Sequence, residues 1–81
     1  MKKLISEAFE VFNSEAPEHA KAWGGLVQSL AKTSGLDPKT HNLAYLSVLA
    51  VLGRENGIPF HVTMAQDLGA SREEVIGAIL V

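Results

Sequence analysis

The chain has 81 residues, of which 47% are hydrophobic and 20% are charged, and its formal net charge is -2. It is one domain at most, with the composition of a folded globular protein and not of a disordered one. The absence of cysteine excludes disulfides, thiolate chemistry and cysteine-based zinc sites, and the 7 Lys and Arg residues are too scattered for a nucleic-acid binder.

No segment has the length or composition of a membrane span or a targeting sequence. The longest nearly apolar run, Leu43 to Leu52, has 10 residues, whereas a membrane span needs about 20. Met1-Lys2-Lys3 resembles the start of a signal peptide, but Glu7 and Glu10 interrupt the stretch that follows. We therefore expect a cytoplasmic protein without a membrane partner.

The spacing of apolar residues in the first half of the chain predicts two helices and no strand. Residues 2–13 carry an apolar stripe at three-to-four spacing, and Ser14 is expected to cap a second helix that ends at Gly35. Gly24-Gly25 lies in the middle of the second helix, where it costs roughly 1–2 kcal/mol relative to two alanines. Either another helix approaches closely there or the helix breaks, and close approach is the preferred interpretation.

Two further helices follow at clear start signals. Asp37-Pro38 begins a helix that runs to about Gly53 and is apolar on nearly every face, which is typical of the middle of a bundle or of a subunit interface. Pro59 suits the first turn of a fourth helix that runs to Leu68 and is closed by Gly69.

Ser71 and Glu74 form a Ser-x-x-Glu capping box at the start of a fifth helix. This helix is apolar from Val75 to Val81 and carries no signal for its end. We expect either that this end is buried against another chain or that the chain is truncated here. Both interpretations predict that the 81-residue chain is not stable as a monomer.

The segment Gly53–His61 places a guanidinium, a carboxylate and an imidazole around one turn. His61 lies at the start of a helix, where the positive dipole end favours a neutral imidazole that can act as a general base. Arg54 can hold a carboxylate through two parallel hydrogen bonds, and Glu55 can orient the imidazole or serve as the partner acid. All three residue types are also common as solvated side chains at helix ends, so the spacing alone is a weak signal.

His41 lies in the first turn of the third helix and could meet His61 across a helix pair. Together with Glu55, the two imidazoles would supply three ligands of the kinds that zinc accepts. No His-Glu-x-x-His motif is present, so we expect no metal.

Four segments stand in an informative order: Leu36-Asp37-Pro38-Lys39-Thr40, Leu52-Gly53-Arg54-Glu55, His61, and Gly69-Ala70-Ser71-Arg72-Glu73-Glu74-Val75. This pattern resembles the carboxymuconolactone decarboxylase family, which shares its fold with the alkylhydroperoxidase D-like proteins. The resemblance implies an all-α helical bundle, a single domain over residues 1–81, and a homo-oligomer, either a trimer or a hexamer. It also implies further helices after Val81, in agreement with a chain truncated at its C-terminus.

The decarboxylase branch of that family carries Gly-Arg-Glu followed by the histidine. The resemblance implies a lyase without a cofactor that removes CO₂ from a small carboxylated lactone or a related acid. His61 would be the acid or base, Arg54 the carboxylate anchor and Glu55 the orienting residue. His41 stands at a substrate-binding position where that branch often has Arg.

The alkylhydroperoxidase branch uses Cys-x-x-Cys and a glutamate, whose positions fall on Arg54, Gly57 and Asn42 in this chain. Thiol peroxidase chemistry needs a thiolate and a resolving thiol, so the missing cysteines argue against it. The alternative to an enzyme is a non-catalytic, oligomeric helical module of the same fold. The segment Gly57-Ile58-Pro59, which departs from the polar residues usual there, favours that alternative.

Overall fold

The computed structural model describes residues 5–81, and all regular elements in that range are helical. Their order is α1 (Glu7–Glu15), α2 (Pro17–Thr33), α3 (Pro38–Val51), the short 3-10 helix η1 (Glu55–Gly57), α4 (Ile58–Asp67) and α5 (Arg72–Leu80). The predicted all-α architecture is confirmed. The first helix was predicted over residues 2–13. Residues 2–4 lie outside the described residues, and the predicted start is wrong for residues 5 and 6, because Ser6 caps a helix that begins at Glu7 and continues to Glu15. None of the helices in 5–81 is both long and apolar enough to cross a bilayer.

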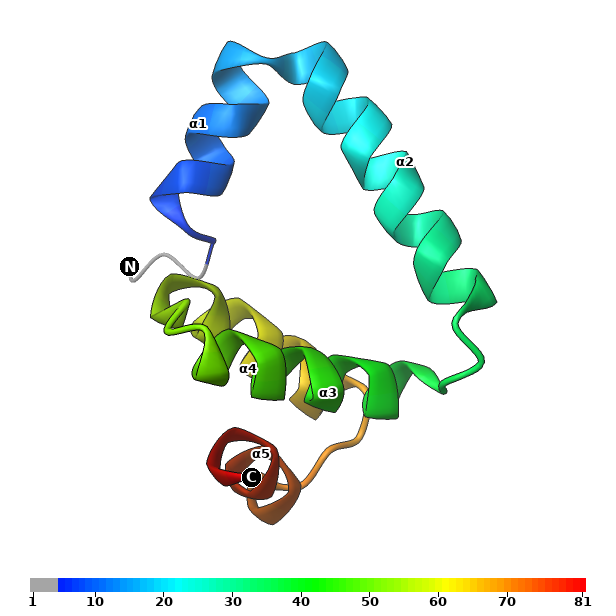
Figure 1. Cartoon of the computed structure of the whole chain (residues 1–81), viewed down its shortest axis with the longest axis vertical. Helices are drawn as coiled ribbons and strands as arrows, with labels where there is room; N and C mark the ends of the chain where they lie inside the picture. The colour runs from blue at the N-terminus through cyan, green and yellow to red at the C-terminus, as the bar shows by residue number, and fades with distance from the viewer. Residues whose placement is uncertain (1–4) are drawn as a thin grey trace.

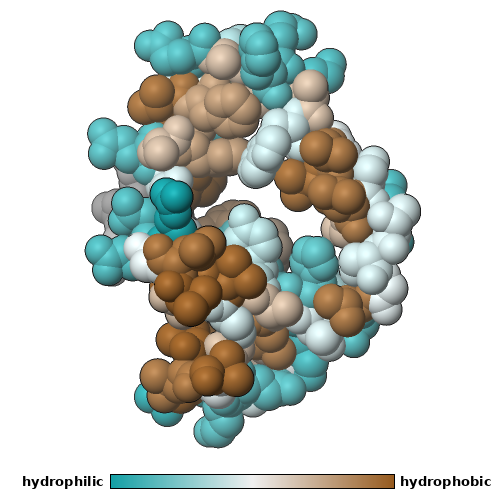
Figure 2. All heavy atoms as spheres, in the orientation of Figure 1, coloured by the Kyte–Doolittle hydropathy of each residue, from teal (hydrophilic) through white to brown (hydrophobic). Residues whose placement is uncertain are grey.

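The helices form two groups. Helix α3 packs against both α4 and α5, whereas α1 packs against α2, and the α1–α2 pair forms a bent arm that arches away from the other helices (Figure 1). In the space-filling view an opening passes between this arm and the rest of the chain (Figure 2). The accessible surface is 6196 Å², about 1,500 Å² more than the roughly 4,700 Å² of a compact chain of this mass. The chain is therefore open.

An aromatic cluster holds the arm together at its bend. The Trp23 ring on α2 lies 5.9 Å from the Phe9 ring and 6.0 Å from the Phe12 ring on α1, measured between centroids. The Ser6 hydroxyl caps α1 by accepting a hydrogen bond from the Phe9 N–H at 3.2 Å. These contacts reach only the first half of α2, because α1 is the shorter helix.

The predicted cap of the second helix is wrong. Helix α1 continues to Glu15, so Ser14 lies inside it, and its hydroxyl donates a hydrogen bond to the Val11 carbonyl at 3.2 Å. Helix α2 begins at Pro17, after Ala16, which provides no side-chain cap. Proline is suited to this position because its φ is already helical and it has no N–H to satisfy.

Helix α2 runs without a break through Gly24-Gly25. No heavy atom from elsewhere in the described residues lies within 4 Å of the position that a Cβ would take on either glycine. The predicted alternatives, a break or the close approach of another helix, therefore both fail within this chain.

We expect Gly25→Ala to raise the free energy of unfolding by about 1 kcal/mol, because alanine orders more favourably in a helix and meets open space here. Gly69→Ala is the matched control. It should lower stability, because Gly69 has a φ of +95° that alanine adopts only with strain. Urea titration of both variants measures the difference, and a destabilised Gly25→Ala would contradict the open surface at this position.

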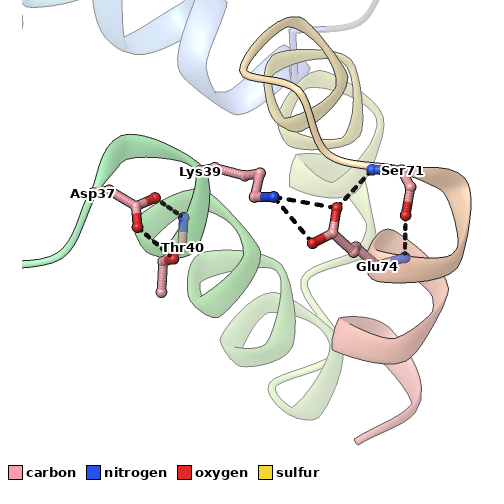
Figure 3. Close-up of polar contacts among 5 residues, drawn as sticks. All are labelled: Asp37, Lys39, Thr40, Ser71 and Glu74. Atoms are coloured by element: carbon pink, nitrogen blue, oxygen red, sulfur yellow. Dashed lines mark hydrogen bonds and ion pairs between the residues drawn. The ribbon is translucent and has the colours of Figure 1, made fainter.

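The predicted start of α3 is confirmed. Asp37 Oδ1 accepts a hydrogen bond from the Thr40 N–H at 2.8 Å, and Oδ2 accepts one from the Thr40 hydroxyl at 2.9 Å (Figure 3). These bonds favour the ionised form, so the Thr40 N–H, and then its hydroxyl, hold the pKa of Asp37 below its usual value.

The capping box of α5 is also confirmed, and it is tied to α3. The Ser71 hydroxyl accepts from the Glu74 N–H at 3.0 Å, and Glu74 Oε1 accepts from the Ser71 N–H at 2.8 Å. Lys39 Nζ on α3 lies 3.0 Å from Glu74 Oε2 (Figure 3). The Ser71 N–H, followed by Lys39, lowers the pKa of Glu74. One carboxylate thus fixes the start of α5 beside the start of α3.

The core lies where α3, α4 and α5 meet. Leu46 on α3 is 0% exposed and packs among Ala65, Ala70 and Val75. The Ser47 hydroxyl donates to the Ala78 carbonyl at 2.7 Å, so that α3 also meets α5 through a polar contact. This small core positions α3 against α4, and the candidate site lies at that contact.

Candidate functional site

His61, in the second turn of α4, is half-buried against α3. Its imidazole stacks on the Tyr45 ring of α3, with centroids 4.1 Å apart and planes inclined by 23°. The neighbouring Phe60 ring meets the imidazole edge-on at 5.3 Å and 89°. Two aromatic rings therefore restrict the imidazole and shield part of it from water.

Asn42, which is only 4% exposed, holds His61 through both ends of its amide. Its Nδ2 donates to the His61 backbone carbonyl at 2.6 Å, and its Oδ1 lies 3.1 Å from His61 Nδ1. A backbone carbonyl can only accept, so the NH₂ of the amide must face it and the amide oxygen must face the ring. An amide oxygen also only accepts, so Nδ1 carries the proton.

The second ring nitrogen of His61 is then the basic one. Burial lowers the pKa of His61 below its ordinary 6.5, because a partly desolvated imidazolium is disfavoured. The neutral ring, protonated at Nδ1, keeps the lone pair on Nε2. The neutral imidazole predicted from the sequence is in agreement with this direction, and the cause of the lowered pKa is burial.

Arg54 and Glu55 lie in a different place. Both are exposed, and they line a pocket of about 320 Å³ together with Ser6, Ala8, Gly53, Asn56 and Gly57. His61 does not line this pocket. Arg54 precedes η1 and Glu55 begins it, so both are separated from the face of α4 that meets α3.

Within one chain the partner of the imidazole is Asn42 and not the expected Glu55, whose orienting role stays a prediction. In residues 5–81 no hydrogen bond joins Glu55 to His61, and Asn42 occupies the orienting position instead. The physical reason is the register of the helices, which brings the inner face of α3 to His61. The roles of Glu55 as partner acid and of Arg54 as carboxylate anchor stay predictions.

His41 is partly buried in the first turn of α3. It precedes Tyr45, the residue that stacks on His61, by four positions, so the two lie about 40° apart around the helix. Over the described part of the chain, no group of three His, Cys, Asp or Glu residues is arranged to hold a metal ion. The role of His41 in binding a substrate stays a prediction.

Asn42 and Tyr45 are the site residues that sequence analysis missed as partners of His61. A signal for them existed, since a lone amide within an apolar helix needs a hydrogen-bond partner if it is buried. The spacing of three between Asn42 and Tyr45 also places both on one face of α3.

These features define an all-α protein with a half-buried histidine anchored by an amide. Residues 17–81 match the carboxymuconolactone decarboxylase family, and the chain belongs to that family. It is 30% identical over 70 residues to "Uncharacterized protein MJ1511" of Methanocaldococcus jannaschii, a match that covers 86% of this chain and 65% of that relative. The chain thus spans somewhat less than two thirds of the relative's length. No solved structure matches the chain.

Proposed function

We propose that this protein is a lyase without a cofactor that removes CO₂ from a small carboxylated lactone or a related acid. The observation that carries the proposal is the state of His61. Its ring is neutral, its Nδ1 proton is fixed by Asn42, and its Nε2 is left basic. A group of this kind can accept and return a proton near neutral pH, and membership of the family supports the reaction class.

The proposed reaction needs only bond cleavage and one proton. The bond between the substrate carbon and its carboxylate breaks, CO₂ leaves, and the electron pair delocalises into the lactone carbonyl. His61 Nε2 takes a proton from solvent and delivers it to the product. No electron acceptor takes part, so the residues need only bind the substrate and move that proton.

In this proposal Arg54 binds a carboxylate of the substrate, because its guanidinium can form two parallel hydrogen bonds with that group. Since Arg54 and His61 do not share a pocket within one chain, we place the active site between copies, with Arg54 from one and His61 from another. Mixing two inactive variants, His61→Ala and Arg54→Ala, should then restore part of the activity, because some mixed sites regain both residues.

The direct test is release of CO₂ from a carboxymuconolactone by the purified protein. We expect His61→Gln to lower the rate by about 100-fold or more, the usual size of general acid–base catalysis. His19→Gln is the matched control, since His19 is an exposed histidine on α2 and should leave the rate unchanged. Full activity in His61→Gln would overturn the mechanism even if the reaction took place.

A second candidate is the non-catalytic helical module. The exposure of Arg54 and Glu55, away from His61, favours it. A folded protein that releases no CO₂ from any carboxylated lactone tested would support this candidate over the lyase. Thiol peroxidase activity is not proposed, because the chain has no cysteine.

A further inference from the structure

The Tyr45 ring covers one face of the imidazole that the proposed function uses. The two rings lie nearly parallel, with centroids 4.1 Å apart and planes inclined by 23°. Tyr45 is 41% exposed, so solvent reaches this ring although the ring shields His61. The contact joins α3 to α4 directly beside the hydrogen bonds of Asn42.

The stacked ring adds a restraint that the amide of Asn42 does not supply alone. A single hydrogen bond at Nδ1 tolerates some rotation of the imidazole plane, since hydrogen bonds accept a range of angles. A parallel ring against the face of the imidazole resists that rotation. Both restraints together hold Nε2 in one place, and proton transfer to a bound substrate depends on such placement to within about 1 Å.

The same ring acts on the charge that the proposed reaction creates. When Nε2 takes up a proton from solvent, the imidazole becomes an imidazolium, and it stays one until the proton passes to the product. The face of a tyrosine ring carries the negative part of its quadrupole and attracts a cation within about 6 Å of its centroid. Burial disfavours the imidazolium, and the face of Tyr45, at 4.1 Å, offsets part of that cost.

No charged side chain within residues 5–81 takes over this role, because none forms a hydrogen bond with His61. On α3, Lys39 is paired with the start of α5, and His41 lies one turn before the stacked ring. On α4 the charged residue is Asp67, in the last turn, and the charged residues of α5 lie in its first turn. Glu55 of η1 lines the separate pocket.

We propose that Tyr45 is a positioning residue for the proton transfer, whose ring fixes the plane of the His61 imidazole and stabilises the imidazolium formed at Nε2. The inference rests on the proposed function and deepens it. The ring and not the hydroxyl has this role, since the hydroxyl forms no hydrogen bond within residues 5–81.

Two substitutions separate the ring from the hydroxyl, and NMR titration of the imidazole C–H signals compares them. Tyr45→Leu keeps an apolar side chain but loses the aromatic face, so the pKa of His61 should fall by about 0.5 or more. Tyr45→Phe keeps the face and should change this pKa by less than about 0.2. Phe9→Leu is the matched control, because Phe9 is 38% exposed and its ring packs on Trp23.

The kinetic readout is the split between kcat and KM for CO₂ release. Tyr45→Leu should lower kcat by about tenfold and leave KM within about twofold, because Tyr45 acts through His61 and not on the substrate. Tyr45→Phe should keep the wild-type kcat. Circular dichroism should show the same helix content in all variants.

The inference is overturned if the pKa of His61 stays constant or rises in Tyr45→Leu, or if Phe and Leu at this position cause equal losses. The titration needs no substrate, so the two proposals can fail separately. A lowered pKa in Tyr45→Leu without CO₂ release by the wild type would keep the stabilised imidazolium and remove the lyase. CO₂ release with wild-type kcat and pKa in Tyr45→Leu would do the opposite.

Discussion

Replacing Leu46 by alanine is expected to lower the free energy of unfolding by about 3 kcal/mol or more. Leu46 is the largest fully buried side chain in residues 5–81, and the core around it contains Ala65, Ala70 and Val75, with the partly buried Leu43, Ile58, Val62 and Ile79 packed against them. The surrounding helices relax only in part when these atoms are removed, so a cavity stays. Since domains of this size are marginally stable, we expect much of the Leu46→Ala protein to be unfolded at 25 °C.

Leu52→Ala is the matched control, since it removes the same atoms from the C-terminal end of the same helix. Leu52 is 64% exposed, so we expect a loss within about 0.5 kcal/mol. Urea titrations at equal protein concentration compare the two variants and keep any association constant. Equal losses in both variants would show that stability does not depend on the contact of α3 with α4 and α5.

The parts of the fold that were predictable depend on residues within one helical turn. Asp37 with Thr40, and Ser71 with Glu74, satisfy free N–H groups at helix starts through side chains three positions away. The pattern is therefore visible in the sequence. Ser14 was predicted wrongly because a serine can also bond back to a carbonyl inside a helix, as it does to Val11.

The partner of His61 was not predictable in the same way. Asn42 lies 19 residues away, and it reaches His61 only because the core fixes the rotation of α3 against α4. Glu55 is nearer in sequence, but η1 directs the chain into a separate turn before α4 begins. Proximity along the chain therefore could not indicate Asn42, whose contact with His61 depends on how the core around Leu46 packs α3 against α4.

The same contact leads to a prediction about pH. Burial sets the folded-state pKa of His61 below the ordinary 6.5, so between these two values the unfolded chain binds more protons than the folded one. The stability that His61 contributes is thus present above about pH 6.5 and is lost as the pH falls through the folded pKa. Urea titrations between pH 5 and 8 should show this decline, and His61→Gln should remove it.

Asn42→Asp should reverse that dependence. A carboxylate at this position accepts the hydrogen bond from Nδ1 and attracts the imidazolium, so the pKa of His61 rises above its unfolded value. The contribution of this pair is then present below pH 6.5 and lost as the pH rises through the folded pKa. The carboxylate cannot donate to the His61 carbonyl, so at pH 8 we expect a loss of about 1–3 kcal/mol.

Asn56→Asp is the control for Asn42→Asp, because it makes the same chemical change at an exposed position in η1. NMR titration of the imidazole C–H signals should show a raised pKa of His61 in Asn42→Asp and an unchanged one in Asn56→Asp. Equal shifts in the two variants would mean that net charge, and not the bond to Nδ1, sets the pKa. In that case the proton could no longer be assigned to Nδ1 of His61. Nε2 could then no longer be assigned as the base in the proposed decarboxylation.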